Sequence, residues 1–476
     1  MITMPTLLEQ IADAPRGPGT VAFFDFDGTV IDGFSAGAIF KERLRRLDVN
    51  VVELWDITSA VLEMRVRNST VDNLMDKAVR ALEGKTHEEL LEQAYALFRS
   101  EIAAMIFPQI RAVVHAHHEA GHLVVMSTSA TPYQAVPVCD DLGFDDLIAT
   151  IPTVDASGVL TGELDGRSLW GPRKAQAILD WAESHDVDID QCFGYSNGFE
   201  DVPMLETVGT PVALNPDKDL EREARERGWP TLHLTKPQRG ADVVSTVRTV
   251  TALGSVMASA GLGAALGILG RNRRTGANVT NAMAPALALA IMGVKVEVEG
   301  EENLWSHRPA VFMFNHQSTL DAIVVSGIIA RDVTAIAKKE LSRDPRFALL
   351  GAVFDVAYVD RSDSKAAREA MQPAIDKLHS GVSVAIAPEG TRMPTTRLGK
   401  FKKGGFHLAM EAGVPIVPIV LHDTGSVMWK SSFTAHSGSV RVTVGEPIPT
   451  TDWDPTKLDE YVDDVRSFFD RTLGNV

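Results

Sequence analysis

The chain has 476 residues, 45% of them hydrophobic, which at ~150 residues per domain predicts two or three domains with sizeable cores. Its two cysteines, Cys139 and Cys192, exclude a disulfide framework and a multi-cysteine zinc site. The net charge of −17 argues against nucleic-acid binding, and it is uneven: residues 1–240 hold 21 basic and 38 acidic side chains, whereas residues 241–476 hold 25 of each.

Short apolar runs alternate with helical patterns through the first half of the chain. Residues 173–185 predict a helix, and residues 36–106 show helical patterns without a strand-like run. Strands that alternate with helices predict a parallel α/β sheet, so residues 36–106 are the expected helical insertion. The opening residues lack a basic region and a long apolar region, so no secretory signal is expected. The predicted strands are residues 20–25, 122–127, 192–196, 210–214 and 231–234.

An apolar region follows a linker expected at residues 236–248. No residue from Val250 to Gly270 is charged, and a second apolar stretch runs from Ala282 to Val294. The first run is just long enough to cross ~30 Å of hydrocarbon as a helix, although its glycine and alanine content weakens insertion. We expect a helical hairpin over about 250–294 that enters one leaflet; a true span and a helix buried against protein stay open.

Two local patterns refine this expectation. The spacing Gly263-x-x-x-Gly267 permits close helix packing. Arg271, Arg273 and Arg274 follow the first apolar run and would anchor its end at the cytoplasmic face.

Beyond Gly300 the α/β pattern resumes. Residues 456–473 predict a terminal amphipathic helix with its apolar side chains on one face. The predicted strands are residues 310–314, 334–337, 356–359, 384–387 and 414–421.

An aspartate pair follows the first predicted strand. Asp25 stands at the strand end, Asp27 points to the same side two residues later, and Gly28 allows a tight turn. Carboxylates at this edge of a parallel sheet suit Mg²⁺, and one of them can attack phosphorus while the other handles protons. The alternative is a solvated Asp-Gly turn.

Further residues at strand ends and helix starts favour phosphate chemistry. Ser127 ends the second strand, where its hydroxyl and nearby N–H groups could hold a phosphate. Lys174 opens a helix and could neutralise the phosphoryl group. Asn197 and Asp201 follow the strand 192–196 and could complete a metal site.

These motifs, in this order, resemble the haloacid dehalogenase (HAD) superfamily, in particular its phosphoserine-phosphatase-like subfamily with a helical cap. The resemblance implies that Asp25 is the phosphorylated nucleophile and Asp27 the general acid/base, that Ser127 and Lys174 hold phosphate, and that Asp201 belongs to the metal site. Asn197 stands where the family usually has a metal-binding aspartate, so one negative charge of the site is gone. Four cap residues are candidates for holding a substrate carboxylate, with a solvated helix face as the simpler interpretation: Arg65, Arg67, Lys77 and Arg80.

A second constellation begins where the strand 310–314 ends. His316 is followed five residues later by Asp321, which can orient the imidazole as a base for a hydroxyl group. The alternative is a capping Asn-His turn before a helix. Charged residues follow two later strands: Arg361 after one, and Glu389, Gly390, Thr391 and Arg392 after the other.

These later residues predict a phosphate clamp beside an apolar groove. Two arginines, the N–H groups near Gly390 and the Thr391 hydroxyl can bind a phosphate, and Lys402 lies in a basic cluster just beyond. The strand 414–421 contains two prolines, which predicts an edge or bulged strand that lines the groove. The whole set suits a substrate with a phosphate head and an apolar tail.

The blocks NHQSTLD, YVDR, PEGTR and VPIVPI resemble the glycerolipid acyltransferase family of the 1-acylglycerol-3-phosphate type. The resemblance implies that His316 is the general base with Asp321 in support. It also implies that Arg361 and the set Glu389, Gly390, Thr391 and Arg392 bind the glycerol phosphate of the acceptor. The acyl donor would be an acyl-CoA or acyl-carrier-protein thioester. The two halves together resemble bacterial fusions of a HAD-type phosphatase with this acyltransferase.

The expected fold is therefore α/β with two domains: a Rossmann-like HAD domain with a helical cap, then a helical hairpin and an α/β glycerolipid acyltransferase domain. The expected cofactor is Mg²⁺ in the HAD domain, and the expected partners are a lysophospholipid, an acyl thioester and the cytoplasmic face of the cell membrane, without nucleic acid; a homodimer stays open. Alternatives are a Mg²⁺-dependent phosphatase docked to membrane, acting on phosphoserine-like or lipid phosphates, and a HAD domain that is a non-catalytic scaffold. The expected segments are 18–235 (HAD, with the cap at about 36–106), 236–248 (linker), 249–294 (membrane-associating helices), 295–450 (acyltransferase) and 451–476 (amphipathic helix).

Overall fold

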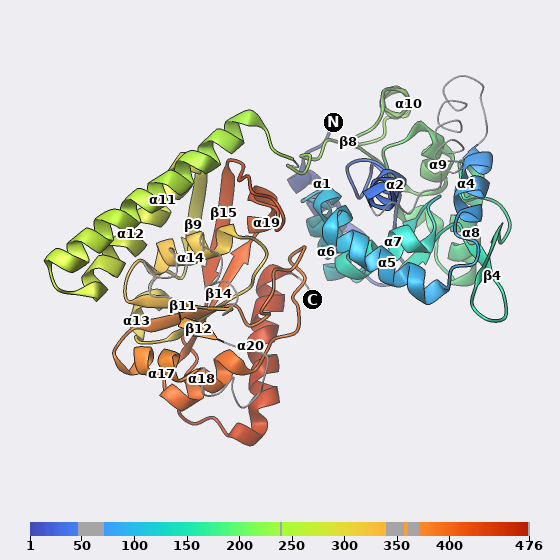
Figure 1. The fold of residues 1–476 in the computed structure, drawn as a ribbon. Coiled ribbons are helices and arrows are strands. Elements are labelled where there is room, and N and C mark those ends of the chain that lie inside the picture. Colours follow the sequence, from blue (N-terminus) through green and yellow to red (C-terminus); the bar gives the residue numbers. More distant parts are fainter. Residues whose placement is uncertain (46–70, 239, 339–356, 360–370, 475–476) are drawn as a thin grey trace. The chain divides into compact units, whose positions relative to one another are not determined.

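The computed structural model describes residues 1–45, 71–238, 240–338, 357–359 and 371–474 (Figure 1). The chain forms two compact units, Met1–Pro237 and Gln238–Val476. Both units are α/β, which confirms the predicted fold class.

The first unit is built on a six-stranded parallel sheet, counted over the described residues, in the order β3-β2-β1-β6-β7-β8. Strand β1 lies between β2 and β6, so the strand order reverses beside it, and ligands bind at such switch points in open α/β sheets. The strands are β1 (Val21–Phe24), β2 (Leu123–Ser127), β3 (Asp146–Ile148), β6 (Phe193–Ser196), β7 (Thr210–Leu214) and β8 (Thr231–Leu232).

Helices surround this sheet, and α7 shows how the sequence sets their ends. Its side-chain cap is Thr131, Pro132 follows at the first position, and Gly143 ends it in the left-handed conformation with φ +82°. The helices packed around the sheet are α1 (Met4–Asp13), α6 (Ile110–Glu119), α7 (Pro132–Leu142), α8 (Pro172–Ser184), α9 (Val202–Thr207) and α10 (Lys218–Arg227), with short 3-10 turns η2 (Ile189–Gln191) and η3 (Phe199–Asp201).

The regular elements in the described part of the predicted insertion are helices. It contains α2 (Ser35–Arg45), α4 (Val71–Arg80), α5 (His87–Ser100) and η1 (Ile102–Met105). A capping box between Thr86 and Glu89 starts α5. A hairpin that the sequence did not indicate, β4 (Pro152–Val154) and β5 (Leu160–Leu164), packs against α4.

The second unit contains a seven-stranded sheet in its described part, in the order β12-β11-β13-β10-β14-β15-β9. All neighbours are parallel except β14 and β15. The strands are β9 (Val294–Glu299), β10 (Val311–Phe314), β11 (Val333–Lys338), β12 (Ala357–Val359), β13 (Ser383–Ile386), β14 (Ile416–His422) and β15 (Gly438–Val444).

Both faces of this sheet are buried, as the alternation along β10 shows. Phe312 packs on one face with α12 and α14, and Val311 and Met313 pack on the other face with α17, α18 and α20. The helices of this unit are α11 (Val243–Leu269), α12 (Arg273–Met292), α13 (Asn303–Ser306), α14 (Leu320–Ile329), α17 (Gln372–His379), α18 (Gly404–Ala412), α19 (Thr424–Val427) and α20 (Leu458–Leu473), with η5 (Pro455–Lys457) before the last.

Of the two alternatives predicted for residues 414–421, an edge strand or a bulged strand, the edge strand is wrong. Strand β14 lies in the interior of the sheet between β10 and β15. Its ladder with β15 begins at the pair Ile419↔Val444, so Pro418 stands just outside it, where no N–H is required. The Pro418 ring packs instead against Gly445, where an added Cβ would lie 2.7 Å from the ring.

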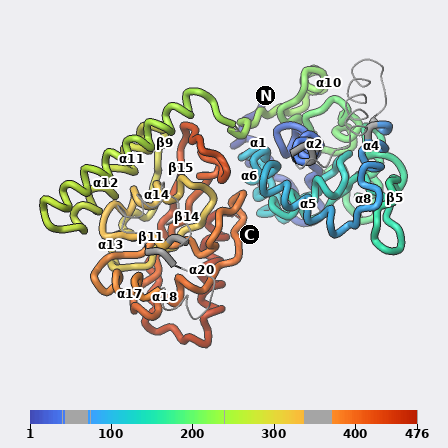
Figure 2. The backbone as a smooth tube through the Cα atoms, viewed as in Figure 1, coloured from blue at the N-terminus to red at the C-terminus, as the bar shows by residue number. Residues whose placement is uncertain are grey.

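The helices α11 and α12 lie side by side as an antiparallel hairpin (Figure 2). Glycine permits their close contact: a Cβ at Gly263 would lie 2.5 Å from the carbonyl oxygen of Gly276, and a Cβ at Gly276 would lie 2.4 Å from that of Gly263. Helix α11 is long and apolar enough to cross a membrane by length and composition. Helix α12, however, buries one face against the body of the unit, including Ala288 and Leu289.

Candidate functional sites

Four residues predicted from the sequence meet where β1, β2 and β6 end. Lys174, in the first turn of α8, places its Nζ 2.7 Å from Asp25 Oδ1 and 2.8 Å from Asp201 Oδ1. The Ser196 hydroxyl donates to Asp201 Oδ2 at 2.7 Å. Ser127 is fully buried, and its hydroxyl has no hydrogen-bond partner within the described residues. A buried hydroxyl of this kind is available to a ligand.

Burial dominates the electrostatics of this first site. It raises the pKa of Asp25 above its ordinary value, although the Lys174 ammonium opposes the shift. Burial alone would lower the pKa of Lys174, but its ion pairs with Asp201 and Asp25 outweigh burial and the pKa lies above its usual range. Lys174 therefore stays charged and offsets two buried carboxylates.

Asp27 connects the sheet edge to the insertion. Its Oδ1 accepts a hydrogen bond of 2.7 Å from the Ser35 N–H at the start of α2, and its Oδ2 accepts one of 3.1 Å from the Ser35 hydroxyl. Burial raises the pKa of Asp27 to about 6, and the Ser35 N–H partly opposes this. A carboxyl with this pKa is suited to proton transfer near neutral pH.

Asn197 packs against the turn that follows Asp25. The Thr29 hydroxyl lies 2.9 Å from Asp25 Oδ2 and 3.1 Å from Asn197 Oδ1. Gly28 has φ +88°, and a Cβ there would lie 2.3 Å from Asn197 Nδ2, so only glycine allows this approach.

The described residues contain no group of three or more His, Cys, Asp or Glu side chains arranged to hold a metal ion. An asparagine oxygen is not among these ligand types. The Asp25 carboxylate and the Asn197 amide oxygen both meet at the Thr29 hydroxyl, so oxygen donors converge there. This donor chemistry fits a hard cation such as Mg²⁺, with one charge fewer than a carboxylate pair would provide.

The cap candidates are only partly placed. Arg65 and Arg67 lie outside the described residues, and Lys77 and Arg80 occupy the last turn of α4, where Arg80 is exposed. The sequence did not single out Arg173, whose Nη2 lies 2.5 Å from Asp72 Oδ1 and ties the start of α8 to α4. No motif marks this pair, because its members are about one hundred residues apart.

The second site begins where β10 ends. His316 Nδ1 lies 2.8 Å from Asp321 Oδ2, which also accepts hydrogen bonds from the N–H groups of Gln317 (2.7 Å) and Ser318 (2.8 Å). Asp321 is fully buried, whereas 24% of the His316 side chain is exposed. Because the carboxylate accepts from Nδ1, the exposed ring presents Nε2 as a proton acceptor.

The PEGTR segment reaches the same edge from β13, the parallel neighbour of β10. Glu389 accepts hydrogen bonds of 2.9 Å from the His316 N–H and from the Gly399 N–H. Burial raises the pKa of Glu389 to about 7, and these two N–H groups oppose the shift. Arg392 Nη1 donates to the Thr319 hydroxyl at 2.6 Å and to the Lys430 carbonyl at 2.7 Å.

Of the other predicted clamp residues, three lie in or near the PEGTR turn and one lies outside the described residues. Gly390 turns the chain with φ +69°, and Thr391 is exposed beside it. The side chain of Lys402 is exposed, while its N–H donates to the Pro388 carbonyl at 2.8 Å, so it stays near the PEGTR turn. Arg361 lies outside the described residues.

Two contacts of the second site had no signal in the sequence. The Met393 N–H donates to the His316 carbonyl at 2.7 Å. Arg466 of α20 donates at 3.3 Å to the carbonyls of Leu398 and Gly399. Neither residue belongs to a motif, and only the folded chain brings them to the site.

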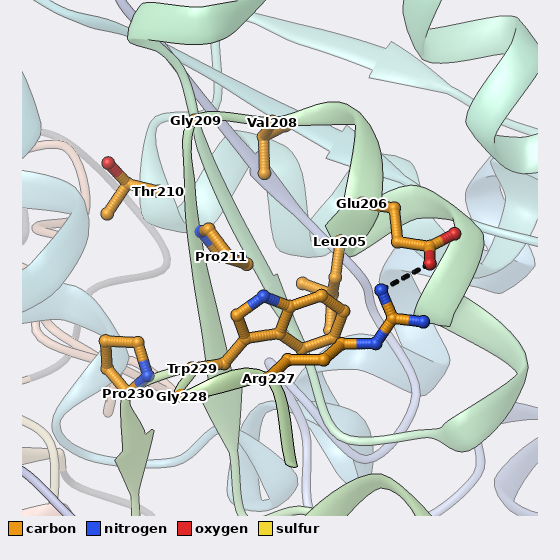
Figure 3. A pocket seen from close by; sticks show the side chains of 10 residues that line it. All are labelled: Leu205, Glu206, Val208, Gly209, Thr210, Pro211, Arg227, Gly228, Trp229 and Pro230. Atoms are coloured by element: carbon orange, nitrogen blue, oxygen red, sulfur yellow. Dashed lines mark ion pairs between the residues drawn. The ribbon is translucent and has the colours of Figure 1, made fainter. Parts of the chain in front are cut away.

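A cavity of about 450 Å³ lies elsewhere in the first unit (Figure 3). Arg227 Nη1 pairs with Glu206 Oε1 at 2.6 Å, and the Arg227 guanidinium lies 5.1 Å from the centre of the Trp229 ring. Thr210 at its rim begins β7, so the cavity lies at the edge of the sheet opposite to Asp25. It contains none of the predicted site residues.

Comparisons with known proteins match each unit separately. A family model described as haloacid dehalogenase-like hydrolase matches residues 22–206, and one described as acyltransferase matches residues 295–422. An inhibition of morphological differentiation protein from Streptomyces azureus is 33% identical over 256 residues, which cover 52% of this chain and 92% of that protein.

Two further relatives carry enzyme names. A phosphoserine phosphatase from Mycobacterium tuberculosis is 32% identical over 44% of this chain and 68% of its own length. A 1-acyl-sn-glycerol-3-phosphate acyltransferase from Cocos nucifera is 34% identical over 38% of this chain, and the match spans 58% of that protein.

Proposed function

The chain belongs to the haloacid dehalogenase-like hydrolases over residues 22–206 and to the acyltransferases over residues 295–422, and we propose that its second unit acylates 1-acyl-sn-glycerol 3-phosphate to phosphatidate. The observation that carries this proposal is the pair of His316 Nδ1 and Asp321 Oδ2, 2.8 Å apart, beside the PEGTR turn. The acyl donor is an acyl-CoA or acyl-carrier-protein thioester.

The reaction needs one base and no covalent enzyme intermediate. His316 Nε2 takes the proton of the acceptor hydroxyl as its oxygen attacks the thioester carbonyl. The C–S bond breaks, an ester bond forms, and the thiolate leaves with the proton returned by His316. Asp321 keeps the imidazole in the reactive tautomer and stabilises its charged form without being protonated.

The direct test is product analysis. Purified chain incubated with lysophosphatidate and an acyl-CoA is expected to yield phosphatidate and free CoA in equal amounts. An absence of both products, with acyl-carrier-protein thioesters as well, would contradict the proposal.

Arg392→Ala is expected to raise the KM for lysophosphatidate, with little change in the KM for the thioester. A charged hydrogen bond to phosphate is worth ~1.5–3 kcal/mol, which is about a tenfold to 150-fold rise. Steady-state kinetics with each substrate varied in turn measures it. Arg441→Ala, at an exposed arginine on β15, is the matched control. A rise confined to the thioester KM would remove Arg392 from the phosphate clamp.

For the first unit we propose hydrolysis of a phosphomonoester. Asp25 would attack phosphorus, Asp27 would protonate the leaving alcohol, and Lys174 and Ser127 would hold the phosphoryl oxygens. A water deprotonated by Asp27 would then attack the phosphorylated Asp25, release phosphate and restore the carboxylate. Asp25, Asn197 and Asp201 would hold Mg²⁺, which when bound would neutralise phosphoryl charge. What supports this is the ion pair of Lys174 with Asp25 and Asp201, beside the unpartnered Ser127 hydroxyl. Mg²⁺-dependent hydrolysis of an aryl phosphate tests it.

We also propose that the hairpin of α11 and α12 docks the enzyme to the cytoplasmic face of a membrane. The outer side of α11 exposes large apolar side chains, including Val247 (59% exposed), Val250 (56%) and Leu262 (45%). Because α12 is packed against the sheet, an interfacial position of the hairpin is favoured over a true span.

The triple change Val247→Gln, Val250→Gln and Leu262→Gln is expected to weaken binding to lipid vesicles by well over tenfold. Burying an aliphatic side chain of this size is worth ~1.5–3 kcal/mol, and these residues are already exposed, so folding is preserved. Vesicle flotation measures the binding, and Phe433→Gln, at an exposed apolar residue outside the hairpin, is the control. Unchanged flotation of the triple variant would show that the hairpin is not the docking surface.

A further inference from the structure

The family resemblance implies that Glu389 binds the acyl acceptor, lysophosphatidate. In the structure, however, both of its carboxylate oxygens accept hydrogen bonds from backbone N–H groups of the protein. Oε1 accepts from the His316 N–H and Oε2 accepts from the Gly399 N–H, each at 2.9 Å. The residue is 3% exposed. Each carboxylate oxygen thus already accepts an N–H of the protein, and the side chain is buried away from a substrate. In its ionised form it would also repel a phosphate.

The strand register explains why a side chain is needed here. The ladder of β10 with β13 ends at the pair Met313↔Ile386, and His316 and Glu389 stand three residues beyond it. Pro388 has no N–H and cannot continue the ladder. The Glu389 side chain therefore supplies the acceptor for the His316 N–H that the strand no longer provides.

The His316 backbone is held on both sides by the same turn. Its N–H donates to Glu389, and its carbonyl accepts from the Met393 N–H at 2.7 Å. Asp321 separately holds the ring and the two following N–H groups. Asp321 therefore holds the ring of His316, whereas Glu389 and the Met393 N–H hold its backbone.

Charge and packing agree with a buried, internal role. Burial raises the pKa of Glu389 to about 7, and the titratable groups that face it are His316 and Asp321. Gly399 is packed tightly against it: a Cβ there would lie 3.2 Å from Glu389 Oε2 and 2.9 Å from Met393 Sδ. Arg466 of α20 holds the Leu398 and Gly399 carbonyls from the other side.

We propose that Glu389 is a positioning residue that sets the backbone of His316 against the 393–399 loop, and that it is not a ligand of the acceptor phosphate. The inference rests on the proposed acyltransfer and gives the PEGTR turn two separate tasks. Arg392 is exposed and keeps the proposed role in the phosphate clamp, and Glu389 faces inward and acts through His316.

The kinetic test is Glu389→Gln, which keeps the shape but leaves one of the two N–H groups facing an amide NH₂. We expect kcat to fall about 10–100-fold, since misplacing a catalytic group by ~1 Å can cost 10²-fold, with the KM for lysophosphatidate within twofold of wild type. Glu446→Gln, at an exposed carboxylate, should change neither. A raised acceptor KM with kcat retained would overturn the proposal.

A second variant reaches the same contact without touching Glu389. Gly399→Ala pushes on Glu389 and Met393 and is expected to give the same loss of kcat at constant KM, even where Glu389→Gln fails to fold. Gly404→Ala is the matched control, because a Cβ there meets only the Met371 terminal methyl at 4.0 Å. A Gly399→Ala enzyme with wild-type kcat would contradict the role of the contact.

Hydrogen exchange separates this inference from the proposed function. The His316 amide is expected to exchange faster in Glu389→Gln, while the amides of Gln317 and Ser318, held by Asp321, keep their protection. Unchanged exchange at His316 overturns the positioning role whether or not the chain acylates lysophosphatidate. Failure of acyl transfer by wild type, with faster His316 exchange in the variant, overturns the proposed function alone.

Discussion

His316→Ala is expected to lower kcat for acyl transfer by ~10²–10⁴-fold, the usual contribution of a general base. The structure supports this size of effect because His316 is the only group on the 315–321 turn that combines a free ring nitrogen with a buried carboxylate behind it. The side chain is partly exposed, at 24%, so its removal opens toward solvent and the variant should stay folded. Phosphatidate formation from lysophosphatidate and acyl-CoA measures the loss.

Two further variants make this result specific. Asp321→Asn should also reduce kcat, because an amide supports the charged imidazole less well than a carboxylate does. His407→Ala, at an exposed histidine on α18, should leave turnover unchanged. Near-normal turnover in His316→Ala would remove this residue from the mechanism and favour the capping role that the turn could otherwise have.

Asp25→Asn is expected to abolish phosphatase activity and to leave acyl transfer unchanged. An amide cannot attack phosphorus, and it is a poorer ligand for a hard cation than a carboxylate is. The site lies within the first unit, and the acyltransferase residues lie within the second. Release of phosphate from an aryl phosphate at saturating Mg²⁺, measured beside acyl transfer on the same preparation, tests both halves of the statement.

The matched control is Asp13→Asn, at an exposed carboxylate of the same unit. Hydrolysis that survives Asp25→Asn would show that another group is the nucleophile. A wild-type chain that hydrolyses no phosphate ester at any Mg²⁺ concentration would favour the scaffold interpretation of the first unit. Asn197 makes that outcome informative, since it stands where the family usually has a carboxylate.

Short apolar runs in the sequence predict the strands whose ends carry the catalytic candidates. Asp25, Ser127 and His316 each follow or end a short apolar run, and in the structure each lies at or just beyond the end of a strand. These strands can be predicted because a parallel strand buried on both faces is a short, continuous run of apolar residues, which is visible without knowledge of its neighbours. The same locality explains why helical patterns predict the helices α4 and α5 and the terminal helix α20.

The position of a strand within its sheet depends on contacts between distant segments, which local patterns do not predict. The two prolines in residues 414–421 predict an edge or bulged strand, but β14 pairs with β10 and β15 and lies inside the sheet. Its ladder with β15 begins one residue after Pro418. A proline lacks its backbone N–H, so it cannot donate a hydrogen bond to the one neighbouring strand that this N–H would face. Whether that bond is required depends on how far the neighbouring strand extends, which local sequence does not contain.

The direction of the PEGTR side chains was decided in the same way. Motif spacing brought Glu389 and Arg392 to one turn, and the fold turned Glu389 inward to the His316 N–H and Arg392 outward to Thr319 and the Lys430 carbonyl. Arg466 and Met393, which belong to no motif, complete the support. Residue type and spacing specify which chemistry is present, but which oxygen meets which N–H depends on contacts between segments that are distant in the chain.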